Sequence, residues 1–160
     1  MCTSLTQPRN KRRILLFVSW ALVVLCMAII FFLSQEPATE SQSRSDGVIA
    51  ALLSRFGIEF SSHFVRKAAH ALEYCGLSLL LYGAYFVSFR APQPALSVLT
   101  AALYAVSDEA HQYFVPGRAC QLRDVFVDSV GAAAGVLFCT AIFFLLHRIS
   151  KKERYKNGNS

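Results

Sequence analysis

Charged residues are scarce in this chain, and their scarcity excludes an ordinary soluble domain. Only 16% of the 160 residues are Asp, Glu, Lys or Arg, whereas 54% are hydrophobic. Soluble globular domains carry about 25% charged residues. The net charge of +6 invites a nucleic-acid partner, but the basic residues lie mostly at the flanks of apolar runs, as membrane topology signals do. The composition therefore predicts an integral membrane protein in contact with the lipid bilayer, with no nucleic-acid partner.

Paired cysteine motifs and nucleophile motifs are also lacking. The five cysteines have no C-x-x-C spacing, and most lie inside apolar runs. Their pattern excludes a disulfide framework and a cysteine zinc site. Ser107 and Ser129 neighbour acidic residues, but neither lies in a recognisable nucleophile motif.

Four apolar runs are long enough to cross a bilayer as helices. A span needs about 20 apolar residues, which rise about 30 Å as a helix. Continuous apolar runs indicate helices, because a backbone in lipid must satisfy its own hydrogen bonds. We therefore predict an all-α membrane protein, a bundle of four transmembrane helices at 14–33, 68–87, 95–115 and 125–146. The membrane domain is 14–147, between a basic N-terminus (1–13) and a basic tail (148–160).

The Lys and Arg distribution predicts that both termini are cytoplasmic. With the N-terminus inside, ten basic residues fall on the cytoplasmic side and six on the outer side. The first run is too long for a signal peptide, and 34–37 is not a small-x-small cleavage site, so we expect a retained helix. The first outer loop, 34–67, has apolar residues at helical spacing near its end. It could form a short interfacial helix, or pack over the helix ends, which is the interpretation we prefer.

Ionisable side chains occur within the predicted spans, where each costs about 2.5 to 3.5 kcal/mol on insertion scales. They cluster at the start of the second span, the end of the third and the start of the fourth. Because successive helices alternate in direction, all three groups come to the same level in the outer leaflet. We therefore expect one shared polar site, made by His70, Glu73, Asp108, Glu109, His111, Gln112, Arg118, Asp124 and Asp128.

The spacing of residues along the fourth predicted helix indicates the direction in which two acidic side chains point. Asp124, Asp128, Gly131 and Gly135 share a stripe of the fourth predicted helix, being four, three and four residues apart. Two glycines four residues apart form a face for close helix packing. The carboxylates should therefore face a neighbouring helix. A structural interpretation remains beside the functional one, since Asp124 could be a helix N-cap and Arg118 an interface anchor.

The residue types of this site suit two kinds of chemistry. Carboxylates beside imidazoles can act as general acids and bases, which makes His70, Glu73, Asp108, Glu109 and Asp128 the candidate catalytic residues. The same acids with a histidine could instead hold a divalent cation. Arg118 could bind a phosphate or carboxylate in bidentate fashion. The candidate substrate-binding residues are His111, Gln112, Arg118 and Asp124.

Three separated motifs, in order, resemble the VanZ-like family. Residues 66–74 are similar to its R-K-x-x-H-x-x-E-Y element, and 108–118 are similar to its D-E-x-x-Q…P-G-R element. Residues 124–135 resemble D-x-x-x-N-x-x-G-x-x-x-G, with Asp128 where that pattern often has Asn. The resemblance implies a multi-pass protein of the bacterial plasma membrane with a role in the cell envelope. It also implies a role in resistance to teicoplanin, because the family is named for a protein linked to that resistance.

Three hypotheses of function follow. In the first, the outer-leaflet site binds or acts on a lipid, a lipid-linked wall precursor or a glycopeptide-related ligand. In the second, the protein is a non-catalytic binding or scaffold protein. The third, a small transporter, is less favoured, because the acids stop near one face and the cytoplasmic halves of the spans are apolar.

Overall fold

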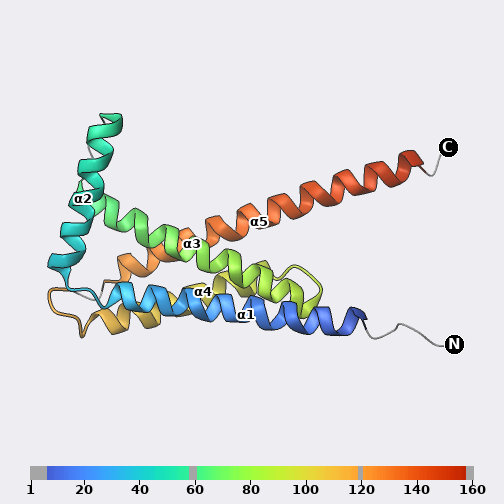
Figure 1. Cartoon of the computed structure of the whole chain (residues 1–160), viewed down its shortest axis with the longest axis horizontal. Coiled ribbons are helices and arrows are strands. Elements are labelled where there is room, and N and C mark those ends of the chain that lie inside the picture. Colours follow the sequence, from blue (N-terminus) through green and yellow to red (C-terminus); the bar gives the residue numbers. More distant parts are fainter. Residues whose placement is uncertain (1–6, 58–60, 119–120, 158–160) are drawn as a thin grey trace.

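The chain folds into five helices in the computed structural model, which describes residues 7–57, 61–118 and 121–157. The helices are α1 (Gln7–Ser34), α2 (Ala38–Phe56), α3 (Ser62–Phe89), α4 (Pro94–Gln112) and α5 (Leu122–Asn157). Four of them, α1, α3, α4 and α5, run along the long axis of the molecule, and α2 crosses one end of this bundle (Figure 1). α1 begins and α5 ends at the opposite end (Figure 1). No strand occurs in the described part of the chain, so the predicted all-helical class is confirmed.

Local signals explain where these helices begin and end. The side chain of Ser61 accepts a hydrogen bond from the backbone N–H of Phe64 at 3.2 Å, which caps the start of α3. Pro94 occupies the first turn of α4, where its missing N–H has no helical partner to lose. Gly117 has a φ of 75°, which a residue without a Cβ adopts freely, and it makes the turn between α4 and α5.

Among the residues that the structure describes, three helices are long and apolar enough to cross a membrane: Asn10–Ser34 of α1, Ser62–Phe89 of α3 and Leu122–Lys151 of α5. They correspond to the first, second and fourth predicted spans. α4 lies alongside them in the bundle (Figure 1) but does not meet the same measure of length and apolarity. Its last turns carry Asp108, Glu109, His111 and Gln112, which lower its apolar character. The fourth span and the cytoplasmic location of both termini remain predictions.

The segment between the first two spans contains a helix, α2, which crosses the end of the bundle (Figure 1). α2 begins ten residues before Val48, where the apolar residues with helical spacing start, and it contacts α3. Within α2, Ser45 is buried, whereas Val48 and Leu53 are exposed. The expected helix is therefore present and packs against α3, and its place at a membrane interface remains a prediction.

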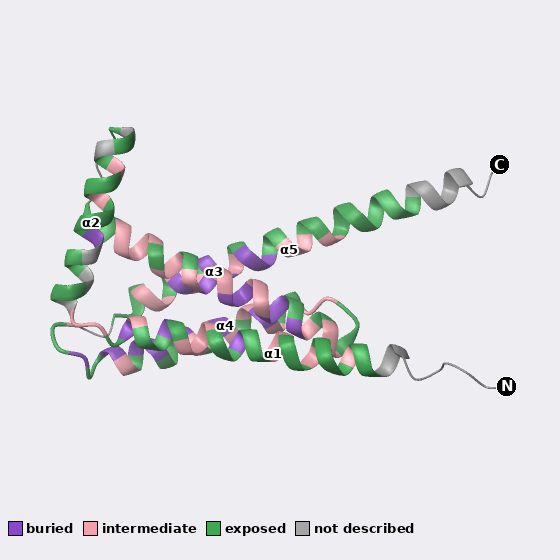
Figure 2. Ribbon diagram, in the orientation of Figure 1, coloured by how far each residue is buried: buried purple, intermediate pink, exposed green. Residues whose placement is uncertain are grey.

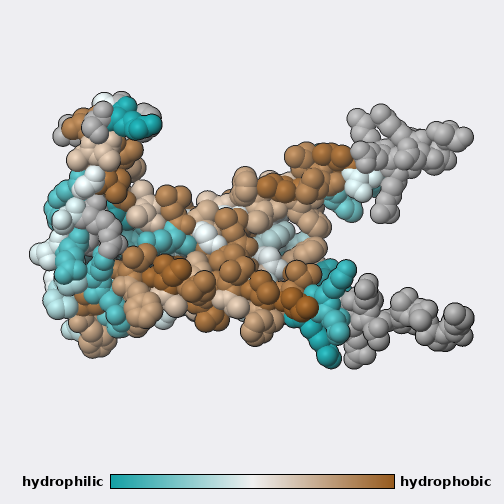
Figure 3. Space-filling model, viewed as in Figure 1, coloured by the Kyte–Doolittle hydropathy of each residue, from teal (hydrophilic) through white to brown (hydrophobic). Residues whose placement is uncertain are grey.

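The bundle is buried along its axis and apolar outside. The core joins Val23 and Ile30 of α1 to α3, α4 and α5 through Tyr74, Leu77, Leu81, Ala84, Ala101, Ala105 and Ala132. Buried residues follow the lines where the helices meet, and the outer faces are exposed (Figure 2). Hydrophobic residues cover the middle of the visible surface, and hydrophilic ones gather around α2 (Figure 3). A large exposed apolar surface is typical of a protein whose surroundings are lipid.

α3 and α5 approach most closely at two glycines. A Cβ added at Gly131 would overlap the backbone carbonyl of Ala71. A Cβ added at Gly135 would lie 2.7 Å from the carbonyl oxygen of Cys75. Both contacts are with α3, so the predicted packing face of the fourth span is confirmed. At Gly131 the nearest neighbours are all backbone atoms of Ala71, and at Gly135 they are the Cys75 carbonyl together with the Ser78 and Cys75 side chains, so Gly131 has the less room for a larger residue.

Replacing Gly131 by alanine should therefore destabilise the protein. We expect Gly131→Ala to cost about 1–3 kcal/mol, the usual cost of overpacking, because α3 and α5 must move apart. Thermal unfolding of the purified protein in detergent micelles measures the loss. Gly76→Ala is the matched control, because no atom lies within 4 Å of an added Cβ there, and alanine favours the helix by up to about 1 kcal/mol. Equal stability of the two variants would contradict a tight contact at Gly131.

Candidate functional site

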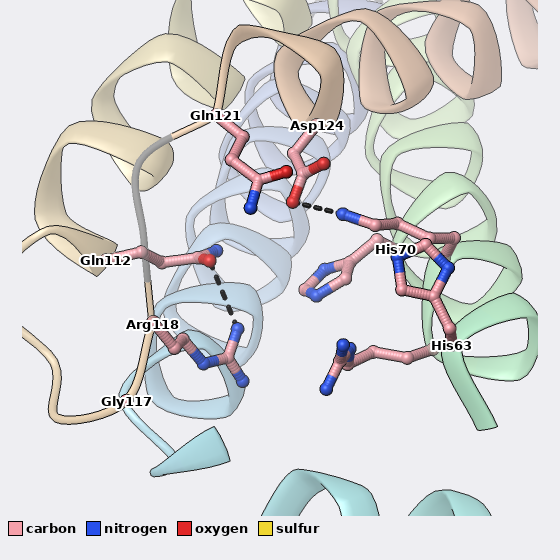
Figure 4. A pocket seen from close by; sticks show the side chains of 9 residues that line it. His63, His70, Gln112, Gly117, Arg118, Gln121 and Asp124 are labelled. Carbon is pink, nitrogen blue, oxygen red and sulfur yellow. Dashed lines mark hydrogen bonds and ion pairs between the residues drawn. The ribbon is translucent and has the colours of Figure 1, made fainter.

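A polar cavity of about 210 Å³ lies at the end of the bundle that α2 crosses. One wall is the first part of α3, where four side chains lie three, one and three residues apart and so share a face: His63, Arg66, Lys67 and His70. The facing wall comes from the end of α4, the connection to α5 and the first turn of α5: Gln112, Gly117, Arg118, Gln121 and Asp124. Figure 4 shows the imidazole of His70 pointing into the space between Arg118 and Asp124.

The lining of the cavity is predominantly basic. Arg66, Lys67 and Arg118 face a single carboxylate, Asp124. Lys67 forms an ion pair with Asp124, and both side chains are largely buried, at 18% and 19% exposure. This pair ties α3 to α5 at the cavity wall and neutralises one of the three cations. The two arginines have no carboxylate partner among the described residues that line the cavity.

Arg66 and Arg118 are close enough to repel each other. Burial lowers the pKa of the Arg118 guanidinium below its ordinary value, and the nearby charge of Arg66 lowers it further. The carboxylates of Asp108, Glu109 and Glu73 act in the opposite direction and offset part of this effect. Within 7–57, 61–118 and 121–157, no hydrogen bond or ion pair holds the guanidinium of Arg66. Like charges held together in a partly buried site cost free energy. An anion bound between them would remove that cost.

A buried hydrogen-bond network positions Arg118. Asp108, which is 3% exposed, accepts bonds through Oδ2 from the Ser34 hydroxyl at 2.7 Å and from Gln112 Nε2 at 3.1 Å. Gln112 Oε1 in turn accepts from Arg118 Nη1 at 3.1 Å. Arg118 Nε donates to the backbone carbonyl of Glu36 at 2.9 Å. The network joins the ends of α1 and α4 to the loop and fixes the guanidinium at the cavity.

Glu109 has a separate role at the start of α5. Its side chain is 2% exposed, and Oε1 accepts a hydrogen bond from the backbone N–H of Gln121 at 2.6 Å. A carboxylate at the positive end of a helix is favoured by the helix dipole. Glu109 thus anchors the N-terminus of α5 and does not line the cavity.

The remaining predicted site residues lie behind or beside the cavity. His70 Nδ1 and Glu73 Oε2 are 3.3 Å apart on α3, and neither atom has a hydrogen-bond partner in the described residues. Asp128, which is 4% exposed, lies on the α5 stripe that packs against α3. His111 packs its ring on Phe31, with centroids 4.6 Å apart, and does not line the cavity.

The acids do not converge as metal ligands. Across the described ranges, no three His, Cys, Asp or Glu side chains lie together in a way that could hold a metal ion. The geometry therefore gives no support to a divalent cation. Asp108 and Glu109 are instead occupied by protein donors.

The structure thus brings together some of the predicted residues and adds others. His70, Gln112, Arg118 and Asp124 line one cavity, and Asp108 adjoins it through Gln112. His63, Arg66, Lys67 and Gln121 also line it and were missing from the candidate site. The signal for three of them was available, because His63, Arg66 and Lys67 share a helical face with His70.

Removing the amide of Gln112 should free the loop that carries Arg118. Gln112→Leu removes the donor to Asp108 and the acceptor for Arg118, and it leaves both charged groups short of a partner. We expect backbone amides between 113 and 118 to exchange hydrogen about tenfold faster, measured by mass spectrometry of the detergent-solubilised protein.

Ser107→Ala is the control for that measurement. Ser107 is exposed, and its hydroxyl bonds only to the Tyr104 carbonyl of its own helix. Exchange in the loop should be unchanged in this variant. Unchanged exchange in Gln112→Leu as well would show that the network does not hold the loop.

Comparison with known proteins gives one match. The model of the family described as VanZ/LLP1 matches residues 17–146, which include α3, α4 and every residue that lines the cavity. No curated protein and no solved structure matches the chain.

Proposed function

The chain belongs to the VanZ/LLP1 family, and from that premise we propose that it is a multi-pass protein of the bacterial plasma membrane that binds the anionic head group of a lipid or lipid-linked wall precursor. The head group occupies the cavity beside α2. It is held by Arg66 of α3 and Arg118 of the loop between α4 and α5.

The observation that carries the proposal is the pair of facing guanidinium groups. Arg118 is fixed by Gln112 and the Glu36 carbonyl, but its Nη2 has no protein partner in the described part of the chain. The guanidinium of Arg66 has no hydrogen bond or ion pair there. Guanidinium groups bind phosphate and carboxylate oxygens with short, charge-assisted hydrogen bonds. Two such groups directed at one small cavity are an arrangement suited to an anion.

The size of the cavity limits what it can enclose. Pockets that enclose drug-sized ligands measure about 300–1,000 Å³, whereas this cavity measures about 210 Å³. It has room for a head group and not for a complete glycopeptide. The rest of a bound lipid would lie outside the cavity, along the apolar surface of the helices (Figure 3).

Binding is favoured over acid–base catalysis by the positions of the acids. Of the five candidate catalytic residues, only His70 lines the cavity. Asp108 and Glu109 accept hydrogen bonds from protein groups, and Asp128 faces α3. If the protein were only a structural scaffold, the repulsion between Arg66 and Arg118 would lower its stability and no bound anion would offset that cost. A transporter is disfavoured because the cavity is confined to one end of the bundle.

Removal of either arginine should weaken the binding of an anionic lipid. We expect Arg66→Gln and Arg118→Gln each to lower affinity for dioleoyl-phosphatidic acid about tenfold or more, since each loses charge-assisted hydrogen bonds. Native mass spectrometry of the detergent-solubilised protein, titrated with the lipid, measures the affinity. Arg66→Gln is the cleaner variant, because Arg66 makes no hydrogen bond or ion pair among the described residues.

Lys151→Gln is the matched control for these variants. Lys151 is exposed near the far end of α5, so its loss removes a positive charge without touching the cavity. Affinity should remain that of the unmodified protein. If all three variants bound the lipid equally, the cavity would not be the binding site.

A role in teicoplanin-type resistance belongs to the same proposal. Expression in a host without a homologue should raise the teicoplanin concentration needed to stop growth. Arg118→Gln should abolish this effect while its membrane level, measured by immunoblot, stays normal. Glu73→Gln and Asp108→Asn should keep the effect if the site only binds its ligand, because neither side chain lines the cavity. Unchanged resistance in Arg118→Gln would assign that residue to the scaffold of the bundle.

A further inference from the structure

We propose that the preferred head group is a dianion of phosphate-monoester type, rather than a singly charged phosphodiester or carboxylate. This inference rests on the proposed function and names the chemical class of its ligand. It follows from a charge count in the cavity, together with the distribution of free donors.

The charge count begins with the ion pair. Lys67 and Asp124 neutralise each other at the junction of α3 and α5. Asp124 is the only carboxylate among the described residues that line the cavity, so the remaining arginines, Arg66 and Arg118, have no acidic partner there. The cavity wall therefore carries two guanidinium groups that no carboxylate of that wall pairs with. A dianion can form an ion pair with each of them, whereas a singly charged anion must share one charge between them.

The carboxylates of Asp108, Glu109 and Glu73 lie behind the cavity wall and attract the Arg118 guanidinium, but none of them hydrogen-bonds to it in the described residues. Asp108 is separated from Arg118 by Gln112, which bonds to both of them. Glu109 is directed at the backbone N–H of Gln121. Neither carboxylate lines the cavity, so neither takes the place of the ligand. His63 and His70 line it as well, and either imidazole can add a donor or a positive charge but no negative one.

The donors also suit a group with several equivalent oxygens. Arg118 lies on the α4–α5 loop and Arg66 on α3, so the two side chains line the cavity from different walls. A phosphate monoester presents three acceptor oxygens and a charge of about −1.5 to −2 near pH 7. It can therefore bond to both arginines at once. A phosphodiester has one charge to share between them and an esterified oxygen in place of a charged one.

The test compares two lipids that differ by one methyl group. Dioleoyl-phosphatidic acid is a phosphate monoester, and dioleoyl-phosphatidylmethanol is its singly charged methyl diester. Both lipids are compared at pH 9, well above the second ionisation of a phosphate monoester, which has a pKa of about 6 in phosphorylated side chains. We expect the unmodified protein to bind the monoester about tenfold more tightly than the diester. Since the pH and the protein are the same in both titrations, the ratio reports the difference between the two head groups.

Arg66→Gln removes one of the two guanidinium groups and should reduce that ratio to about one. Lys151→Gln, the control distant from the cavity, should keep it. Equal affinity of the unmodified protein for both lipids would overturn the dianion preference but leave the proposed anion site standing. Binding of neither lipid would overturn the proposed function itself, so the two failures are distinguishable.

Soluble competitors identify the source of the dianion. Methyl phosphate, a monoester without a lipid tail, should displace bound phosphatidic acid at lower concentrations than dimethyl phosphate does. Displacement by both at the same concentration would contradict the inference. If methyl phosphate alone bound as tightly as the lipid, the dianion preference would stand and the ligand would be a soluble phosphate rather than a membrane lipid.

Discussion

The close contact of α5 with the backbone of α3 at Gly131 and Gly135 is the constraint on which the polar end of the bundle depends. Without side chains at these two positions, α5 can lie directly on Ala71 and Cys75. The same stripe of α5 then carries Asp128 against α3 and brings Asp124 to Lys67. The ion pair, the wall of the cavity and the direction of the α4–α5 loop all follow from that approach.

Acidic and basic residues have different roles at this end of the bundle. The acids are internal: Asp108 accepts bonds from α1 and α4, and Glu109 accepts one from the start of α5. The bases face the cavity, and only Lys67 is neutralised by a carboxylate of its wall. Protein donors reduce the cost of burying these carboxylates, whereas the repulsion between the two arginines is reduced when an anion binds between them. This contrast between internal acids and bases that face the cavity is the reason we expect the site to bind an anion.

Much of the fold was predictable from the sequence, because apolar length, helix direction and residue spacing are local properties. They predicted the helices, the common level of the polar groups and the glycine face of α5. The extent of α2 and the continuation of α5 to Asn157 were not predicted, because these segments lack a continuous apolar run.

The site was predicted less completely. Spacing gives the face of a helix on which a side chain lies, but not the partner that it meets across the bundle. Glu109 therefore looked catalytic, although its partner is the backbone N–H of Gln121. Spacing likewise did not give the partner of His111, whose ring packs on Phe31. The face that Arg66 and Lys67 share with His70 indicates a binding site only once Arg118 is known to lie opposite. The sequence does not give that position across the bundle.

An experimental density map of the purified protein in nanodiscs containing phosphatidic acid tests the central claim most directly. The account predicts density for a phosphate group between Arg66 and Arg118, within hydrogen-bond distance of both guanidinium groups, with Lys67 still paired to Asp124. A map in which both arginines bind protein carboxylates, with no lipid head group in the cavity, would contradict it.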